Sequence, residues 1–228
     1  MKQIKPGNFG NSVSTDSCRM QFDFGNEQLL YTGVPIDYLF IGDSITALWE
    51  QQVYLGTGCR IVNRGIGGDC STYLLKRFDA DCVQLKPKTA ILMIGTNDIS
   101  RCHDDLWWHV KGQEESVVLE EYQHNIRQMI AKCDANGIHL VLCSVLPSTI
   151  APPFDREMRW RMTDAMNAFL QSTGKPYVDY FHALTEDGKN LPADLSPDGI
   201  HPNAKAYAIM ATVLKKTLSP WINEEEIK

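Results

Sequence analysis

The 228-residue chain has no long run of basic residues and no long run of apolar ones. Its formal net charge is −6, which argues against nucleic acid or an anionic membrane surface as the main partner. The longest apolar stretches fall well short of the roughly 20 residues that a membrane-spanning helix needs. The N-terminus has no apolar core of signal-peptide length. We therefore expect a soluble, cytoplasmic protein with no membrane insertion.

Four further patterns are missing. The 7 cysteines are scattered and form no C-x-x-C pair, which is typical of reduced thiols rather than of a disulfide framework. Neither G-x-x-x-x-G-K-[ST] nor G-x-G-x-x-G occurs, so nucleotide or flavin binding has no support. No H-x-H pair occurs, and this weakens the case for a two-metal site.

What the sequence does contain, from Ile36 onwards, is an alternation of short apolar runs with helical patterns. Strands that are apolar on both faces and alternate with helices predict an α/β fold, with a parallel sheet covered on two sides. We expect a single domain over 36–228, with 1–35 as an N-terminal arm packed on it and one short helix near 20–26. The strands are predicted at 36–42, 59–65, 89–95, 138–146 and 175–180, and the helices at 44–53, 71–85, 117–137, 155–174 and 202–218.

Polar, glycine-containing turns follow four of these elements. Ligands bind beyond the carboxyl ends of the strands in an open parallel sheet, so these turns are expected to meet at one edge. They cover 42–44, 63–69, 95–98 and 196–203.

Ser44, in the first of these turns, could act as a nucleophile if a base removed its proton. His201 could be that base, because Asp198 lies three residues earlier and could orient the imidazole. The oxyanion that forms on attack needs donors already in place. The backbone N–H of Ser44, a glycine N–H from 63–69 and the side-chain amide of Asn97 could supply them.

Four segments, "FIGDSIT", "NRGIGGD", "IGTND" and "DGIHPN", resemble the successive conserved blocks of the SGNH hydrolases, also called GDSL esterases/lipases. The resemblance runs from about Tyr38 to the end of the last helix. "GIGGD" is most similar to the branch that contains platelet-activating-factor acetylhydrolase subunits and carbohydrate acetylesterases. Four motifs in order are far more specific than any one of them.

This resemblance implies a three-layer α/β/α sandwich around a five-stranded parallel sheet, flavodoxin-like in order, with no metal and no cofactor. It implies that Ser44 is the nucleophile, His201 the base and Asp198 its orienting carboxylate. The oxyanion hole would consist of Ser44, Gly68 and Asn97. A one-residue slip in the alignment would replace Gly68 by Gly67.

Other polar residues of these turns have ordinary structural interpretations. We expect Asp43 and Asp69 to cap backbone N–H groups at helix starts, and Asp98 to be a local cap rather than a second acid. Apart from His201, only His103 is expected to have an aspartate close by in the sequence, and His103 is read as a surface residue.

The segments 100–116 and 147–160 are expected to reach the same edge of the sheet. The first of them, like the arm 1–35, has no counterpart in the four motifs. The aromatic and basic side chains of 100–116 and 147–160 are candidates for substrate binding, although core packing is an equally good interpretation of the tryptophans. The candidates are Trp107, Trp108, Phe154 and Arg156.

The sequence thus favours a serine hydrolase whose partner is a small-molecule ester, with a short acyl group, such as acetyl, on a carbohydrate or small metabolite. The alternatives are a lysophospholipase or thioesterase of the same family, a metal-dependent phosphoesterase using Asp43, Asn97 and His201, and a catalytically inactive binding homologue. A homodimer is common among small esterases, but no residue pattern demands one.

Overall fold

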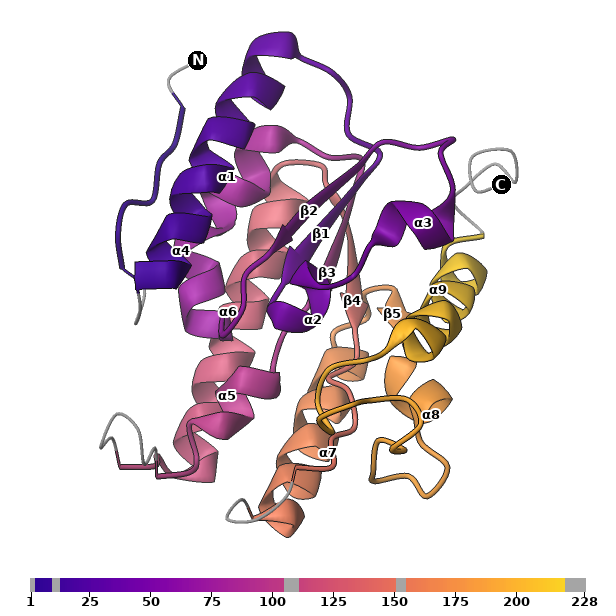
Figure 1. Ribbon diagram of the computed structural model, residues 1–228. Helices are drawn as coiled ribbons and strands as arrows, with labels where there is room; N and C mark the ends of the chain where they lie inside the picture. The colour runs from indigo at the N-terminus through magenta and orange to yellow at the C-terminus, as the bar shows by residue number, and fades with distance from the viewer. Residues whose placement is uncertain (1–2, 10–12, 105–110, 151–154, 220–228) are drawn as a thin grey trace.

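A computed structural model describes residues 3–9, 13–104, 111–150 and 155–219. Its centre is a five-stranded, wholly parallel sheet in the order β2-β1-β3-β4-β5 (Figure 1). The strands are β1 (Tyr38–Gly42), β2 (Ile61–Gly65), β3 (Thr89–Met93), β4 (His139–Cys143) and β5 (Tyr177–Val178). The predicted α/β fold with a five-stranded parallel sheet is confirmed.

Helices cover both faces of the sheet, because successive residues of each strand point to opposite sides. In β1, Leu39 and Ile41 join one apolar core, and Tyr38 and Phe40 join the other. The first core is completed by α4 (Ser71–Asp81), α6 (Glu115–Ala135) and α7 (Arg156–Ser172), and the second by α3 (Gln51–Leu55), α8 (Tyr180–Leu184) and α9 (Ala204–Leu218). The remaining elements are α1 (Val13–Thr32), α2 (Ser44–Ala47), α5 (Thr96–Ser100) and the 3-10 turn η1 (Val83–Leu85).

The first three strands end at one level of the sheet. Gly42, the last residue of β1, lies opposite Gly65 of β2 and Met93 of β3. The turns that follow these strands are therefore neighbours in space, as the alternation of strands and helices predicted.

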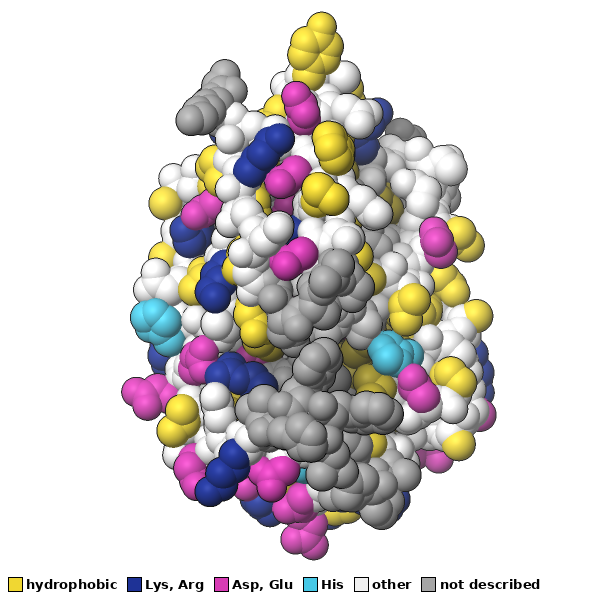
Figure 2. All heavy atoms as spheres, turned by 60° about the vertical axis from the view of Figure 1, so that its left-hand side comes forward, with side chains coloured by type: hydrophobic (Ala, Val, Ile, Leu, Met, Phe, Trp, Pro, Cys, Tyr) yellow, Lys and Arg dark blue, Asp and Glu magenta, His cyan; other side chains and the backbone are white. Residues whose placement is uncertain are grey.

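Helix α1 corrects one expectation, because it is 20 residues long rather than a short helix near 20–26. It packs against α4, and its buried side chains include Arg19 and Asn26, whereas Phe24 and Tyr31 are exposed. In this helix polar residues face inwards and apolar residues face outwards. The sequence therefore lacks the usual periodic pattern of apolar residues on the buried face, by which a surface helix is identified. Figure 2 shows hydrophobic side chains gathered at the upper end of the face that carries this helix.

The predicted helix 44–53 is interrupted. Helix α2 ends at Ala47, and α3 begins at Gln51. Between them Trp49 turns into the second core, where its ring lies 5.4 Å from Tyr207 and 5.6 Å from Phe40. Burial of this large ring outweighs the continuation of a regular helix.

None of the helices in the described residues is long and apolar enough to cross a membrane.

Two glycines should respond to alanine in opposite ways. Gly25 lies inside α1, where a Cβ would meet only an Arg64 nitrogen, at 3.5 Å. Gly25→Ala should therefore raise the free energy of unfolding by about 0.5–1 kcal/mol. At Gly42 a Cβ would collide with the Met93 carbonyl oxygen and the Thr46 side chain. Gly42→Ala should lower the free energy of unfolding by about 1–3 kcal/mol or more.

Urea unfolding of both variants measures the two effects. Equal destabilisation by the two substitutions would contradict the close approach at Gly42.

Candidate functional site

Ser44 is the first residue of α2, immediately beyond the carboxyl end of β1. Asp43 is the N-cap, and its Oδ1 accepts a hydrogen bond from the Ile45 N–H at 2.9 Å, as the sequence predicted. The half-buried Ser44 therefore sits on a short turn between a strand and a helix, with its backbone N–H at the helix start.

His201 and Asp198 lie beside Ser44, although the histidine and the serine are 157 positions apart in the sequence. His201 Nε2 is 2.9 Å from Ser44 Oγ, and His201 Nδ1 is 2.6 Å from Asp198 Oδ2. These are the contacts that a nucleophile, its base and an orienting carboxylate require.

The surroundings of Asp198 keep its carboxylate ionised. Burial raises the pKa of Asp198, but hydrogen bonds from the His201 side chain and from the backbone N–H groups of His201 and Ile200 outweigh it. The pKa therefore lies well below its usual range. An anionic acceptor at Nδ1 holds the imidazole proton there and leaves Nε2 free to accept a proton from Ser44.

The turn that carries Asp198 and His201 is held by the segment after β4. The Thr149 N–H donates to the Gly199 carbonyl at 2.8 Å, and the Gly199 N–H donates to Ser196 Oγ at 2.9 Å. Gly199 has φ +80°, and a Cβ there would strike the Thr149 carbonyl. Only glycine fits this close backbone contact.

The glycine loop after β2 passes over Ser44. The Ile66 N–H donates to the Gly42 carbonyl at 3.0 Å, and a Cβ on Gly67 would lie 3.9 Å from the Ser44 Cβ. Asn97 Nδ2 donates to the Asp69 carbonyl at 2.8 Å. A primary amide has two N–H groups, so Asn97 retains a second donor beside this loop. The structure thus brings Ser44, the 66–69 loop and Asn97 together.

Two predicted caps prove to be something else. Asp69 is fully buried and forms an ion pair with Arg77 at 2.6 Å. Asp98 is not a local cap, because it accepts hydrogen bonds from the N–H and the Oγ of Ser71, at the start of α4. Asp98 contacts Ser71, which lies 27 residues earlier, and Asp69 contacts Arg77, which lies eight residues later. Neither partner therefore belongs to the turn that carries the carboxylate.

A second Asp–His pair was missed. His182 Nδ1 lies 2.7 Å from Asp179 Oδ2, and the His182 N–H donates to Asp179 Oδ1, the same local geometry as at His201. The D-x-x-H spacing at 179–182 was the signal that could have found it. The His182 side chain is 70% exposed, and no serine is recorded as its partner within the described part of the chain.

Of the four candidate substrate-binding residues, the structure describes Arg156. Trp107, Trp108 and Phe154 lie outside the described residues. Arg156 is exposed on the first turn of α7. One turn later, Arg159 is buried and donates to Ser148 Oγ and Ser100 Oγ, so it ties α7 to the segments that follow β4 and β3. No sequence pattern singled it out.

The residues of the metal alternative are engaged in other contacts. Asp43 caps α2, Asn97 donates to a carbonyl, and His201 lies between Ser44 and Asp198. In the ranges that the structure describes, no group of three or more His, Cys, Asp or Glu residues is arranged to hold a metal ion.

Comparison with known proteins gives concordant matches. A model of the GDSL-like Lipase/Acylhydrolase family matches residues 40–209. The acetylxylan esterase of Geobacillus stearothermophilus is 28% identical over 176 residues, which cover 75% of this chain and 78% of that protein. The thioesterase 1/protease 1/lysophospholipase L1 of Escherichia coli K12 is 23% identical over 199 residues, covering 82% and 85%.

Solved structures share the fold. A GDSL-like lipase from Bacteroides thetaiotaomicron superimposes with a TM-score of 0.67 at 22% identity, covering 88% of this chain and 100% of that one. An acetylxylan esterase from G. stearothermophilus gives a TM-score of 0.61 at 22% identity, covering 83% and 97%.

The buried Asp43 should make the stability of the protein depend on pH. Burial and the nearby carboxylates of Asp69 and Asp98 raise the pKa of Asp43 to about 7. The folded state then binds this proton more tightly than the unfolded state, so the stabilisation is present at low pH and is lost as pH rises through about 7. Asp43→Asn retains the acceptor for Ile45 but cannot ionise.

The free energy of unfolding of Asp43→Asn, relative to that of the unmodified protein, should therefore increase by on the order of 2 kcal/mol as pH rises from about 4 to about 7. Urea unfolding across this range measures it. A difference that is independent of pH would show that Asp43 does not titrate in this window.

Proposed function

The chain belongs to the GDSL-like lipase/acylhydrolase family, and we propose that it cleaves carboxylic esters through an acyl-enzyme formed on Ser44. The observation that carries this proposal is the continuous set of contacts from Ser44 Oγ to His201 Nε2, and from His201 Nδ1 to Asp198. This arrangement provides a nucleophile, a base within hydrogen-bonding distance and a carboxylate that stabilises the imidazolium.

In the proposed reaction Ser44 Oγ attacks the ester carbonyl carbon while its proton moves to His201 Nε2. The carbonyl oxygen becomes an oxyanion, stabilised by the N–H groups of Ser44 and Gly68 and by the Asn97 amide. His201 then gives the proton to the leaving alcohol as the C–O bond breaks. Water then attacks the acyl carbon while its proton moves to His201. The bond from the acyl carbon to Ser44 Oγ breaks, and His201 returns the proton to Oγ, which releases the carboxylic acid and restores the Ser44 hydroxyl.

For the substrate we propose a short acyl ester, in particular acetyl, on a carbohydrate or small metabolite. The similarity to an acetylxylan esterase over 75% of the chain supports this choice. A thioester or lysophospholipid is the alternative, supported by the more distant similarity to a thioesterase and lysophospholipase.

The free state of all seven cysteines supports a reducing compartment such as the cytoplasm.

Hydrolysis of p-nitrophenyl esters from acetyl to octanoyl, by protein treated with a chelator, is the direct test. The proposal predicts turnover that is highest with acetyl, one fluorophosphonate adduct on Ser44, and loss of nearly all activity in Ser44→Ala without loss of folding. A preference for octanoyl would favour the lysophospholipase or thioesterase alternative.

The two Asp–His pairs provide a matched control for this test. His201→Ala should remove activity as Ser44→Ala does, whereas His182→Ala should retain it, because His182 is not in contact with Ser44. No adduct and no ester turnover would refute the proposal. Manganese-dependent phosphatase activity would then identify the metal alternative. No activity in either assay would leave an inactive homologue or an enzyme for a substrate that the sequence does not reveal.

Asn97 should act on the transition state more than on substrate binding. Asn97→Ala removes one oxyanion donor, so kcat should fall by on the order of a hundredfold with little change in KM. Steady-state kinetics with p-nitrophenyl acetate measure both constants. An unchanged kcat would make Asn97 a purely structural contact of the Asp69 carbonyl.

A further inference from the structure

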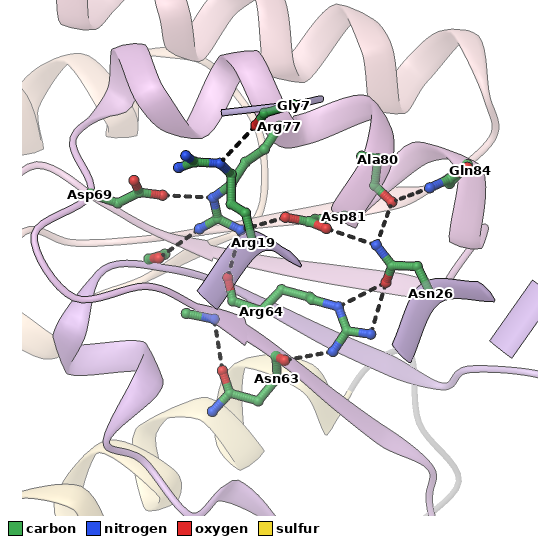
Figure 3. A network of polar contacts seen from close by, with 12 residues as sticks. Gly7, Arg19, Asn26, Asn63, Arg64, Asp69, Arg77, Ala80, Asp81 and Gln84 are labelled. Atoms are coloured by element: carbon green, nitrogen blue, oxygen red, sulfur yellow. Dashed lines mark hydrogen bonds and ion pairs between the residues drawn. The ribbon is translucent and has the colours of Figure 1, made fainter. Parts of the chain in front are cut away.

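Arg77 of α4 is a completely buried arginine whose guanidinium donates to four acceptors, three of them outside α4 (Figure 3). Nε donates to Asp69 Oδ2 at 2.6 Å, and Nη2 donates to the Gly42 carbonyl at 3.0 Å. Nη1 donates to the Arg64 carbonyl at 2.9 Å and to Asp81 Oδ2 at 3.0 Å. A planar guanidinium with donors in fixed directions determines where these acceptors lie relative to one another.

Two of these acceptors flank the proposed oxyanion hole. Gly42 precedes Asp43 and Ser44, and its carbonyl also accepts the N–H of Ile66, at the start of the glycine loop. Asp69 directly follows Gly68. The same guanidinium therefore contacts the nucleophile turn on one side and the glycine loop on the other.

Asp69 links this contact to Asn97. Its carboxylate is held by Arg77, while its carbonyl accepts the Asn97 side-chain amide at 2.8 Å. A shift of Asp69 would therefore move Gly68 through the backbone and Asn97 through this hydrogen bond. All three oxyanion donors depend, directly or through one residue, on the position of the Arg77 guanidinium.

We propose that Arg77 and Asp69 are positioning residues that hold the glycine loop, Asn97 and the Ser44 turn in the geometry of the oxyanion hole. This inference rests on the proposed esterase function. A buried ion pair contributes little net stability, because removal of both charges from water offsets their attraction. Its effect here lies in geometry, since a donor displaced by about 1 Å can lower the rate by about a hundredfold.

The same network extends away from the site to α1. Asn26 Nδ2 donates to Asp81 Oδ1 at 2.8 Å, and Asn26 Oδ1 accepts from the Arg64 guanidinium (Figure 3). Asp81 belongs to α4 itself and touches Arg77 and Asn26 rather than the turns around Ser44. Asp69 and Asp81 are thus two buried carboxylates that accept hydrogen bonds from the same guanidinium. Only Asp69 belongs to the glycine loop.

This pair allows a matched comparison. Asp69→Ala keeps the backbone carbonyl that Asn97 contacts and removes the carboxylate that pairs with Arg77. It should lower kcat for p-nitrophenyl acetate by about ten- to a hundredfold, with KM within about threefold of the unmodified value. Asp69→Asn keeps an acceptor for Arg77 and should recover part of kcat. Asp81→Ala should lower the melting temperature comparably but leave kcat within about threefold.

A second readout does not depend on turnover. Amide hydrogen exchange of residues 66–69 should be faster in Asp69→Ala than in the unmodified protein, and unchanged in Asp81→Ala. Loss of kcat and of protection in Asp69→Ala alone would support the inference. Retention of both in Asp69→Ala, or equal losses in Asp81→Ala, would overturn it.

The two proposals can fail separately. If the unmodified protein turns over no ester and gives no adduct on Ser44, the proposed function fails, and hydrogen exchange alone then decides whether Arg77 and Asp69 anchor the loop. If the unmodified protein is active and Asp69→Ala is equally active, only the positioning inference fails.

Discussion

Gly42 lies opposite Gly65 on one side and Met93 on the other, so β1, β2 and β3 end at one level of the sheet. Every other feature of the site depends on this register. The turns after the three strands become neighbours, and the Gly42 carbonyl accepts hydrogen bonds from both the glycine loop and Arg77. A side chain at position 42 would push β1 away from β3 and separate these turns. The register of the parallel strands thus fixes the relative positions of the short turns that follow them.

Behind the site, the layer between α1 and α4 holds buried charges where an apolar interface would be usual. Arg77, Asp69 and Asp81 are almost inaccessible to water, and each has a partner of opposite charge. Such a network adds rigidity and directional contacts more than it adds net stability. It also gives α1 a defined place, because Asn26 donates to Asp81 and accepts from Arg64.

His201 and His182 show that the local geometry of an Asp–His turn does not determine whether the histidine contacts a nucleophile. Each donates its backbone N–H to an aspartate three residues earlier and has its Nδ1 on the same carboxylate. His201 has Ser44 at Nε2, whereas the His182 side chain is mostly exposed to solvent. The difference arises from the position of each turn relative to β1, since hydrogen-bonding capacity is the same in both.

Much of the architecture was readable in the chain. Strands apolar on both faces, separated by helical patterns, indicated the parallel sheet, because both faces of each strand must be covered. The glycine-containing turns indicated where Ser44, Asn97 and His201 would meet. Local composition did not reveal helix α1, whose inner face is polar, or the interruption at Trp49. Nor did it reveal the partners of Asp69, Asp98 and Arg77. The periodic pattern of apolar residues indicates which side chains of one helix or strand face the core. Arg77 and Asp81 have the i,i+4 spacing of an ion pair within one helix. The contacts of Arg77 with Gly42 and of Asp98 with Ser71 instead join segments far apart in the chain, and no spacing within one segment encodes them.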